Sequence, residues 1–142
     1  MEDIDVKEFI ITFTIPESVK LLSCCNSAII EIEEKMREDN LPDIIINNKI
    51  EPKDSIEKIL SIKTKIKKAI IANFGNRTGL ISIKLDITDI VKLNACCNSA
   101  IETEEKTIEL LDICSVSVDY CRKDIDFIYN IKNKIKSIIH TS

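Results

Sequence analysis

The chain contains an internal repeat, which restricts its possible folds more than any other feature of the sequence. Residues 19–29 and 91–101 are identical at nine of eleven positions, at an offset of 72, whereas about one identity is expected by chance. A second block repeats between residues 56–70 and 125–139, at an offset of 69. We call residues paired by these offsets matching positions. The pattern predicts one domain made of two tandem repeats, residues 8–74 and 80–142.

Each repeat is predicted to begin with a strand and a long helix. In residues 9–15 and 81–87 every second residue is apolar and those between are mostly polar, which is typical of a strand with one buried face. Glu17 and Asp89 then fall in the first turn of a helix, where a carboxylate interacts favourably with the helix dipole. Apolar residues at helical spacing continue each helix: Leu21, Cys25, Ala28, Ile29, Ile32 and Met36, and Leu93, Cys97, Ala100, Ile101, Ile108 and Leu111.

A short extended segment and a second helix are predicted to complete each repeat. The extended candidates are residues 43–47 and 115–120, and Ile residues three or four apart then predict helices beginning near Lys53 and Arg122. The fold class is therefore predicted to be α+β, with a strand–helix–strand–helix unit present twice. A ferredoxin-like four-stranded sheet with one added helix per half is the simplest such arrangement.

Two other architectures remain open at this point. Residues 66–73 could form a strand that turns through Gly75-Asn76 into residues 80–87. A strand followed by two helices also resembles a ribbon-helix-helix repressor, a resemblance which implies that outward strand residues read bases. Here the outward residues include Ile10 and Asp86, and the first helix is longer than in that family.

The second repeat has a further resemblance. The predicted alternating strand is followed by Asp89 and by the run Leu93-Asn94-Ala95-Cys96-Cys97-Asn98-Ser99. Together these residues resemble the small dimerisation subunit of the KEOPS tRNA-modification complex. Asn94 stands where that family has Arg, and the last helix of the second half has no counterpart in it. The resemblance covers less than a third of the chain. It implies a small subunit of an RNA-modifying complex as one possible function.

Cysteine and polar pairs recur at matching positions within the first helix of each repeat. Cys24-Cys25 and Cys96-Cys97 are predicted to pack in the core and could meet across an internal two-fold axis, with a metal or redox site as the alternative. Adjacent helical residues point about 100° apart, so one pair alone does not chelate a metal. The polar repeat positions are Asn26, Ser27, Asn98 and Ser99. They are candidates for hydrogen bonds between helices or for a polar pocket.

The second helix of each repeat is rich in lysine. These helices and the linker between the repeats supply the candidate basic binding residues: Lys63, Lys65, Lys67, Lys68, Arg77, Lys132, Lys134 and Lys136. A solvated helix face is the alternative interpretation. The net charge of −4 is unusual for a nucleic-acid-binding protein, and only 4% of residues are aromatic, so stacking on single-stranded bases is not expected.

Catalysis has little support in the sequence. The chain has two Gly and one His, so neither a Gly-rich phosphate loop nor a compelling Ser–His–acid arrangement is present. We expect no catalytic residue, cofactor or metal ligand. The alternative is an enzyme that uses a metal at paired carboxylates, for which Glu31, Glu33, Glu34, Glu102, Glu104 and Glu105 are the candidates.

The sequence thus favours a non-catalytic binding or assembly protein that forms homo-oligomers through its internal symmetry. An accessory factor of a virus or mobile element fits this hypothesis, with a protein or a second copy as the partner. Nucleic-acid binding through the lysine-rich helices is the main alternative. Neither a secretory signal nor a membrane span is visible, and we expect a cytoplasmic protein with reduced thiols.

Overall fold

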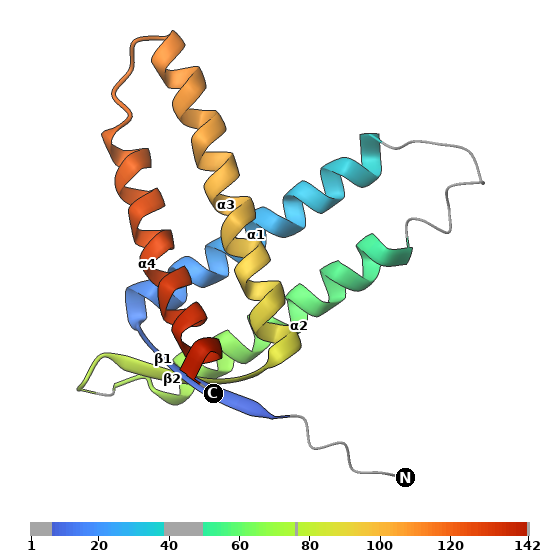
Figure 1. The fold of residues 1–142 in the computed structure, drawn as a ribbon, viewed down its shortest axis with the longest axis vertical. Helices are drawn as coiled ribbons and strands as arrows, with labels where there is room; N and C mark the ends of the chain where they lie inside the picture. The colour runs from blue at the N-terminus through green and yellow to red at the C-terminus, as the bar shows by residue number, and fades with distance from the viewer. Residues whose placement is uncertain (1–6, 39–49, 76, 142) are drawn as a thin grey trace.

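The structure, a computed structural model, describes residues 7–38, 50–75 and 77–141. It is mostly helical, with two strands and four helices in the described ranges (Figure 1). In chain order they are β1 (Glu8–Thr14), α1 (Ile15–Glu38), α2 (Ile50–Ala72), β2 (Leu80–Asp86), α3 (Ile87–Ile113) and α4 (Asp119–Thr141). Each half of the chain therefore contributes a strand followed by two helices.

The two strands form a single antiparallel ribbon. Ile11 is paired with Ile83 at its centre, and Thr12 lies opposite Ser82. Because side chains alternate across a strand, Ile11 and Ile83 face the helices and are almost fully buried, whereas Thr12 and Ser82 face solvent. The alternation seen in the sequence is thus the burial pattern of the ribbon.

Matching side chains start the first helix of each half. The Asp86 side chain accepts a hydrogen bond from the Asp89 backbone N–H, and the Asp89 side chain accepts one from the Asp86 N–H, which together form a capping box. Thr14 and Glu17 exchange the same two bonds, at 2.8 and 3.2 Å. The boxes satisfy N–H groups that a helix start leaves unpaired, so both helices begin directly after their strands.

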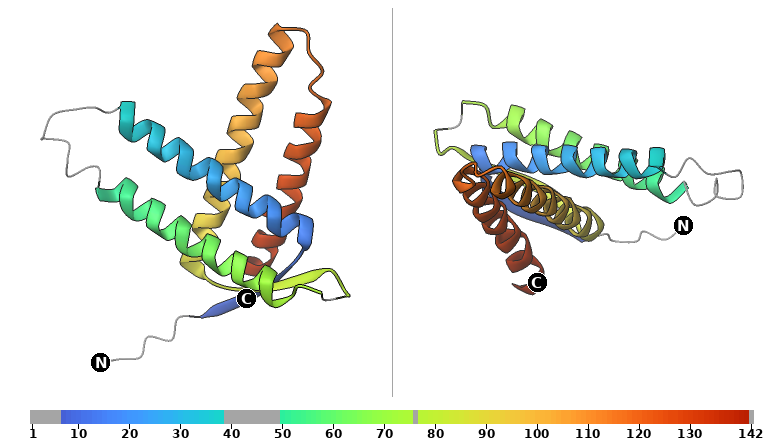
Figure 2. Two further views of the ribbon diagram at one scale, coloured as in Figure 1. Left: turned by 180° about the vertical axis from the view of Figure 1, so that it is seen from behind. Right: turned by 90° about the horizontal axis from the view of Figure 1, so that it is seen from above.

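The helices form two hairpins that meet over the ribbon and diverge away from it. One hairpin is α1 and α2, the other α3 and α4, and α1 crosses α3 between them (Figures 1 and 2). A single core joins both hairpins to the inner face of the ribbon and consists mainly of Ile, Leu and Cys. Phe13, with no exposed surface, is its largest side chain.

The predicted ferredoxin-like four-stranded sheet is wrong. Residues 115–118 form a connection between two helices, in which Ser115 has a positive φ of 57°, and helix α4 already begins at Asp119. The alternation of Val116 and Val118 therefore does not mark a strand, because no strand of the ribbon lies beside it. The other proposed strand, residues 43–47, lies outside the described residues.

The hairpin alternative for residues 66–73 is also wrong, because helix α2 continues to Ala72 and packs Ile66 into the core. Gly75 and Gly79 have φ values of 88° and 68°, which suit glycine in the turns that lead to β2. Among the described residues, no helix is long and apolar enough to cross a membrane.

Candidate nucleic-acid interface

The outward face of the ribbon is open to solvent. It carries Thr12 and Ser82, whose hydroxyl oxygens lie 3.2 Å apart, and the pair formed by Ile10 and Lys84. Ile10 is 58% exposed. The helices lie against the opposite face, so this face offers polar and apolar groups from two adjacent strands to a partner (Figure 1).

Charge is strongly segregated along the molecule although the net charge is negative. Residues 58–92 contain eight Lys or Arg and two acidic residues, and residues 127–139 contain three Lys and no acid. These ranges include the ribbon strand β2 and the ends of α2 and α4 that pack on the ribbon. By contrast, residues 102–112, far along α3, contain five acidic residues and one Lys. The ribbon end is therefore basic and the far end of this hairpin is acidic.

The structure separates the predicted basic residues into two groups. Four of them are exposed, namely Lys67, Lys68, Arg77 and Lys136, and Lys63 is half-buried. Lys84, which the sequence analysis did not select, lies exposed on the outward face itself. Its position in an alternating strand was the available signal, since every second residue of such a strand must face away from the core.

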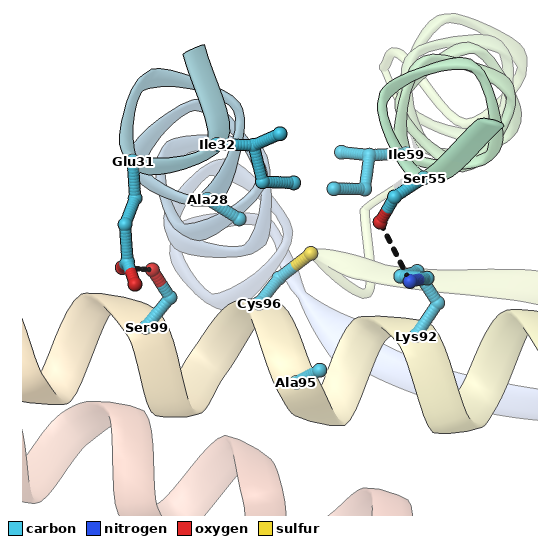
Figure 3. A pocket seen from close by; sticks show the side chains of 9 residues that line it. All are labelled: Ala28, Glu31, Ile32, Ser55, Ile59, Lys92, Ala95, Cys96 and Ser99. Atoms are coloured by element: carbon cyan, nitrogen blue, oxygen red, sulfur yellow. Dashed lines mark hydrogen bonds between the residues drawn. The ribbon is translucent and has the colours of Figure 1, made fainter. Parts of the chain in front are cut away.

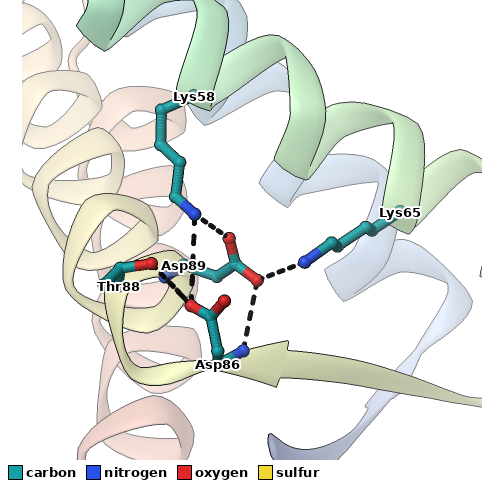
Figure 4. Close-up of polar contacts among 5 residues, drawn as sticks. All are labelled: Lys58, Lys65, Asp86, Thr88 and Asp89. Atoms are coloured by element: carbon teal, nitrogen blue, oxygen red, sulfur yellow. Dashed lines mark hydrogen bonds and ion pairs between the residues drawn. The ribbon is translucent and has the colours of Figure 1, made fainter. Parts of the chain in front are cut away.

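The other predicted lysines form ion pairs or hydrogen bonds with side chains of neighbouring helices. Lys65 and Lys58 of α2 reach the completely buried Asp89 of α3 at 2.5 and 2.6 Å, one at each carboxylate oxygen (Figure 4). Burial alone would raise the pKa of Asp89, but the hydrogen bonds from the two lysines and the Asp86 amide hold that pKa below its ordinary value. Lys65 therefore fixes the start of α3 and is not a free binding group.

Lys134 repeats this arrangement at the matching position. Its Nζ lies 2.6 Å from Glu17 at the start of α1. Burial opposes ionisation of Glu17, yet the hydrogen bonds from Lys134 and the Thr14 amide lower its pKa below the ordinary value. Lys132, only 9% exposed, donates a hydrogen bond to Asn98. These lysines bind the helices to one another.

The polar repeat positions lie in differing surroundings. Ser99 of α3 donates a hydrogen bond to Glu31 of α1, so it links the two crossing helices. Asn98 is exposed and accepts the bond from Lys132. Ser27 is half-buried beside a small cavity, and Asn26 is exposed. The four residues therefore do not form one polar pocket.

The repeated cysteines meet where α1 crosses α3. Cys24, Cys25, Cys96 and Cys97 are all buried, and no disulfide is present among the described cysteines. A hydrogen bond with Cys96, together with burial, raises the pKa of Cys25, while the same bond lowers the pKa of Cys96. A bond with Cys24 raises the pKa of Cys97 in the same way. In the described part of the chain, no group of three or more Cys, His or acidic residues is arranged to hold a metal ion.

No protein-family model matches the chain, and the searches of curated proteins and of solved structures return no match.

Proposed function

We propose that the chain is a non-catalytic binding protein whose ribbon end docks on duplex DNA. The observation that carries the proposal is the ribbon itself, with one face buried and the other open, in the basic end of the molecule. The major groove of B-DNA admits a two-stranded ribbon, so the outward face has a binding partner of suitable shape.

The groups on the outward face suit the edges of base pairs. Lys84 can donate to the acceptors of guanine, Thr12 and Ser82 can donate or accept, and Ile10 offers an apolar surface to a thymine methyl group. Matching positions on the two strands carry different residues, such as Thr12 and Lys84. The proposal therefore implies an asymmetric target sequence.

Exposed lysines beside the ribbon suit the phosphate backbone. The exposed lysines are Lys67 and Lys68 near the end of α2 and Lys136 near the end of α4, two helices that contact the ribbon strands, and Arg77 lies just before β2. Phosphate contacts from such residues position a protein on the duplex without reading sequence. The acidic far end of the α3–α4 hairpin would point away from the DNA, which reduces the effect of the negative net charge.

The test is fluorescence anisotropy of the full chain with labelled duplex DNA and duplex RNA at low salt. Binding to DNA, weakened by Lys84→Ala but not by the control Lys106→Ala on the acidic part of α3, would support the proposal. Because the A-form major groove is too narrow and deep for side chains, duplex RNA should bind more weakly. A preference for RNA would instead favour a role in an RNA-modifying complex.

Self-association is the second candidate, and one surface favours it. The far end of the α3–α4 hairpin exposes Leu110, Ile113, Val116 and Tyr120, with Ile113 80% and Tyr120 79% exposed. Such adjacent apolar residues are typical of protein-binding surfaces. Light scattering should then give a dimer that Ile113→Lys converts to a monomer. A monomer at every concentration would exclude this candidate.

We also propose that the two halves of the chain arose by the tandem duplication that the sequence predicts. Two sets of contacts at matching positions support it: Lys65 with Asp89 and Lys134 with Glu17. A protein of this kind would act in the cytoplasm as an accessory factor, where its free cysteines would stay reduced.

A further inference from the structure

Two small cavities lie at matching positions of the fold. The larger, about 150 Å³, is bounded by α1, α2 and α3, and the smaller, about 110 Å³, by α1, α3 and α4. Each of the nine described residues that line the larger cavity matches a residue that lines the smaller one. The smaller cavity therefore serves as an internal reference for what the larger one lacks.

The smaller cavity contains its own carboxylates. Lys20 Nζ lies 2.6 Å from Asp124 Oδ1, and Glu104 is hydrogen-bonded to Asp124. A lysine that is largely removed from solvent is thus neutralised by the Asp124 carboxylate of α4, which Glu104 of α3 supports by a hydrogen bond.

The larger cavity has the lysine without these carboxylates. Lys92 matches Lys20, but Ser55 stands at the position of Asp124 and Ile32 at that of Glu104. Lys92 Nζ and Ser55 Oγ are 2.7 Å apart. Among the carboxylates whose side chains the structure describes, none lies at ion-pair distance from Lys92. The ammonium group therefore faces a cavity next to a hydroxyl group that can also bind an anion.

The walls of the larger cavity limit what can bind there. Ala28, Ile32 and Ile59 form an apolar surface between the Lys92–Ser55 end and the opposite end, where Glu31 accepts a hydrogen bond from Ser99 (Figure 3). That hydrogen bond lowers the pKa of Glu31, so its carboxylate is ionised. A second negative group on a ligand would be repelled at this end.

We propose that the larger cavity binds a short aliphatic monocarboxylate. Its carboxylate accepts hydrogen bonds from Lys92 Nζ and Ser55 Oγ, and so pairs with Lys92 as the Asp124 carboxylate pairs with Lys20 in the smaller cavity. Its alkyl chain lies against Ile32 and Ile59. A ligand of this size is expected to bind with a Kd on the order of 1 mM.

The test is an NMR titration of the full chain with sodium propionate, exchanged for sodium chloride at constant ionic strength. Saturable shifts of the Ser55, Lys92 and Ser99 amide signals are expected. Succinate should produce much smaller shifts, because its second carboxylate meets Glu31. Absence of saturable shifts at about 50 mM propionate, or equal shifts with succinate, would overturn the proposal.

The variant Ser55→Asp supplies the missing carboxylate from within the protein. It should keep the fold, pair with Lys92 as Asp124 pairs with Lys20, and abolish the propionate shifts. A Ser55→Ala variant removes the hydroxyl group without adding charge, and should weaken binding only several-fold. If Ser55→Asp folds and still binds propionate like the wild type, the ligand does not lie between these residues and the proposal fails.

Discussion

Lys65 Nζ lies 2.5 Å from Asp89 Oδ2, which joins the second helix of the first half to the first helix of the second half. Lys134 and Glu17 make the reciprocal connection at 2.6 Å. Each half therefore supplies the lysine that neutralises the carboxylate at the first helix of the other half. These exchanged contacts tie the halves into one folding unit and hold the ribbon end in shape.

Removing the charge of Asp89 should destabilise the protein more than removing the charge of Glu17, the residue at the matching position. Asp89 is completely buried between two lysines, so Asp89→Asn leaves both without their partner and should cost about 2–4 kcal/mol. Among the described residues Glu17 forms an ion pair only with the partly exposed Lys134, and Glu17→Gln should cost about 1 kcal/mol. Urea denaturation of both variants measures the difference. Equal losses would contradict the buried network drawn in Figure 4.

Adjacent isoleucines on β1 test which face of the ribbon is buried. Ile11 is 2% exposed and Ile10 is 58% exposed. Ile11→Ala should therefore reduce the free energy of unfolding by about 2–4 kcal/mol, because it leaves a cavity in the core. Ile10→Ala should change it by less than about 0.5 kcal/mol. A large loss at Ile10 would mean that another element covers the outward face, where DNA is proposed to bind.

Glu104 and Asp124 form a carboxyl pair that makes the free energy of unfolding depend on pH. Burial and the hydrogen bond to Asp124 raise the pKa of Glu104 from 4.5 to about 7, while Lys20 helps to keep Asp124 ionised. The folded state thus holds a proton on Glu104 that the unfolded chain releases. The resulting stabilisation is present below pH 4.5 and is lost as the pH rises through about 7.

Glu104→Gln should therefore raise the melting temperature at about pH 8, by roughly 3–5 °C, and leave it almost unchanged at about pH 4. The exposed neighbour Glu105→Gln is the matched control and should have little effect at either pH. Thermal unfolding followed by circular dichroism measures all three proteins. A Glu104→Gln variant that is no more stable than the wild type at the higher pH would contradict the raised pKa.

The thiols should divide into exposed and protected groups. Cys114 lies exposed after α3, whereas Cys24, Cys25, Cys96 and Cys97 are buried at the helix crossing. A thiol reagent should modify Cys114 rapidly and the four helix cysteines only as fast as the protein unfolds. Cys114→Ser removes the fast phase if this assignment holds. Rapid modification of the helix cysteines in the folded protein would show that the crossing is open.

The sequence predicted the first strand and first helix of each half because their patterns are local. Alternating residues around Ile11 and Ile83 and carboxylates at Glu17 and Asp89 mark a buried strand face and a helix start. Residues 115–118 misled the prediction because alternation over so few residues does not show whether a partner strand exists. Pairing in a sheet depends on distant segments, which local periodicity does not report.

The exposed basic residues of the proposed interface were partly predictable for the same reason. Lysine-rich helices indicated a basic surface, and Lys67, Lys68 and Lys136 are indeed exposed. Lys65 and Lys134 have the same residue type and nearly the same spacing, but they face carboxylates of another helix. Only the packing of the helices separates the two groups. The open ribbon face depends on the sheet having two strands, which local periodicity did not predict.

The salt dependence of DNA binding tests the central proposal most directly. Neutralising four or five phosphates predicts that log Kobs falls with log salt concentration at a slope of about −4. Lys67→Ala combined with Lys68→Ala should reduce the magnitude of that slope by about 2, while Lys84→Ala should weaken binding to a preferred sequence more than to random duplex. Binding that is absent at low salt, or a slope that these substitutions leave unchanged, would contradict a DNA interface at the ribbon end.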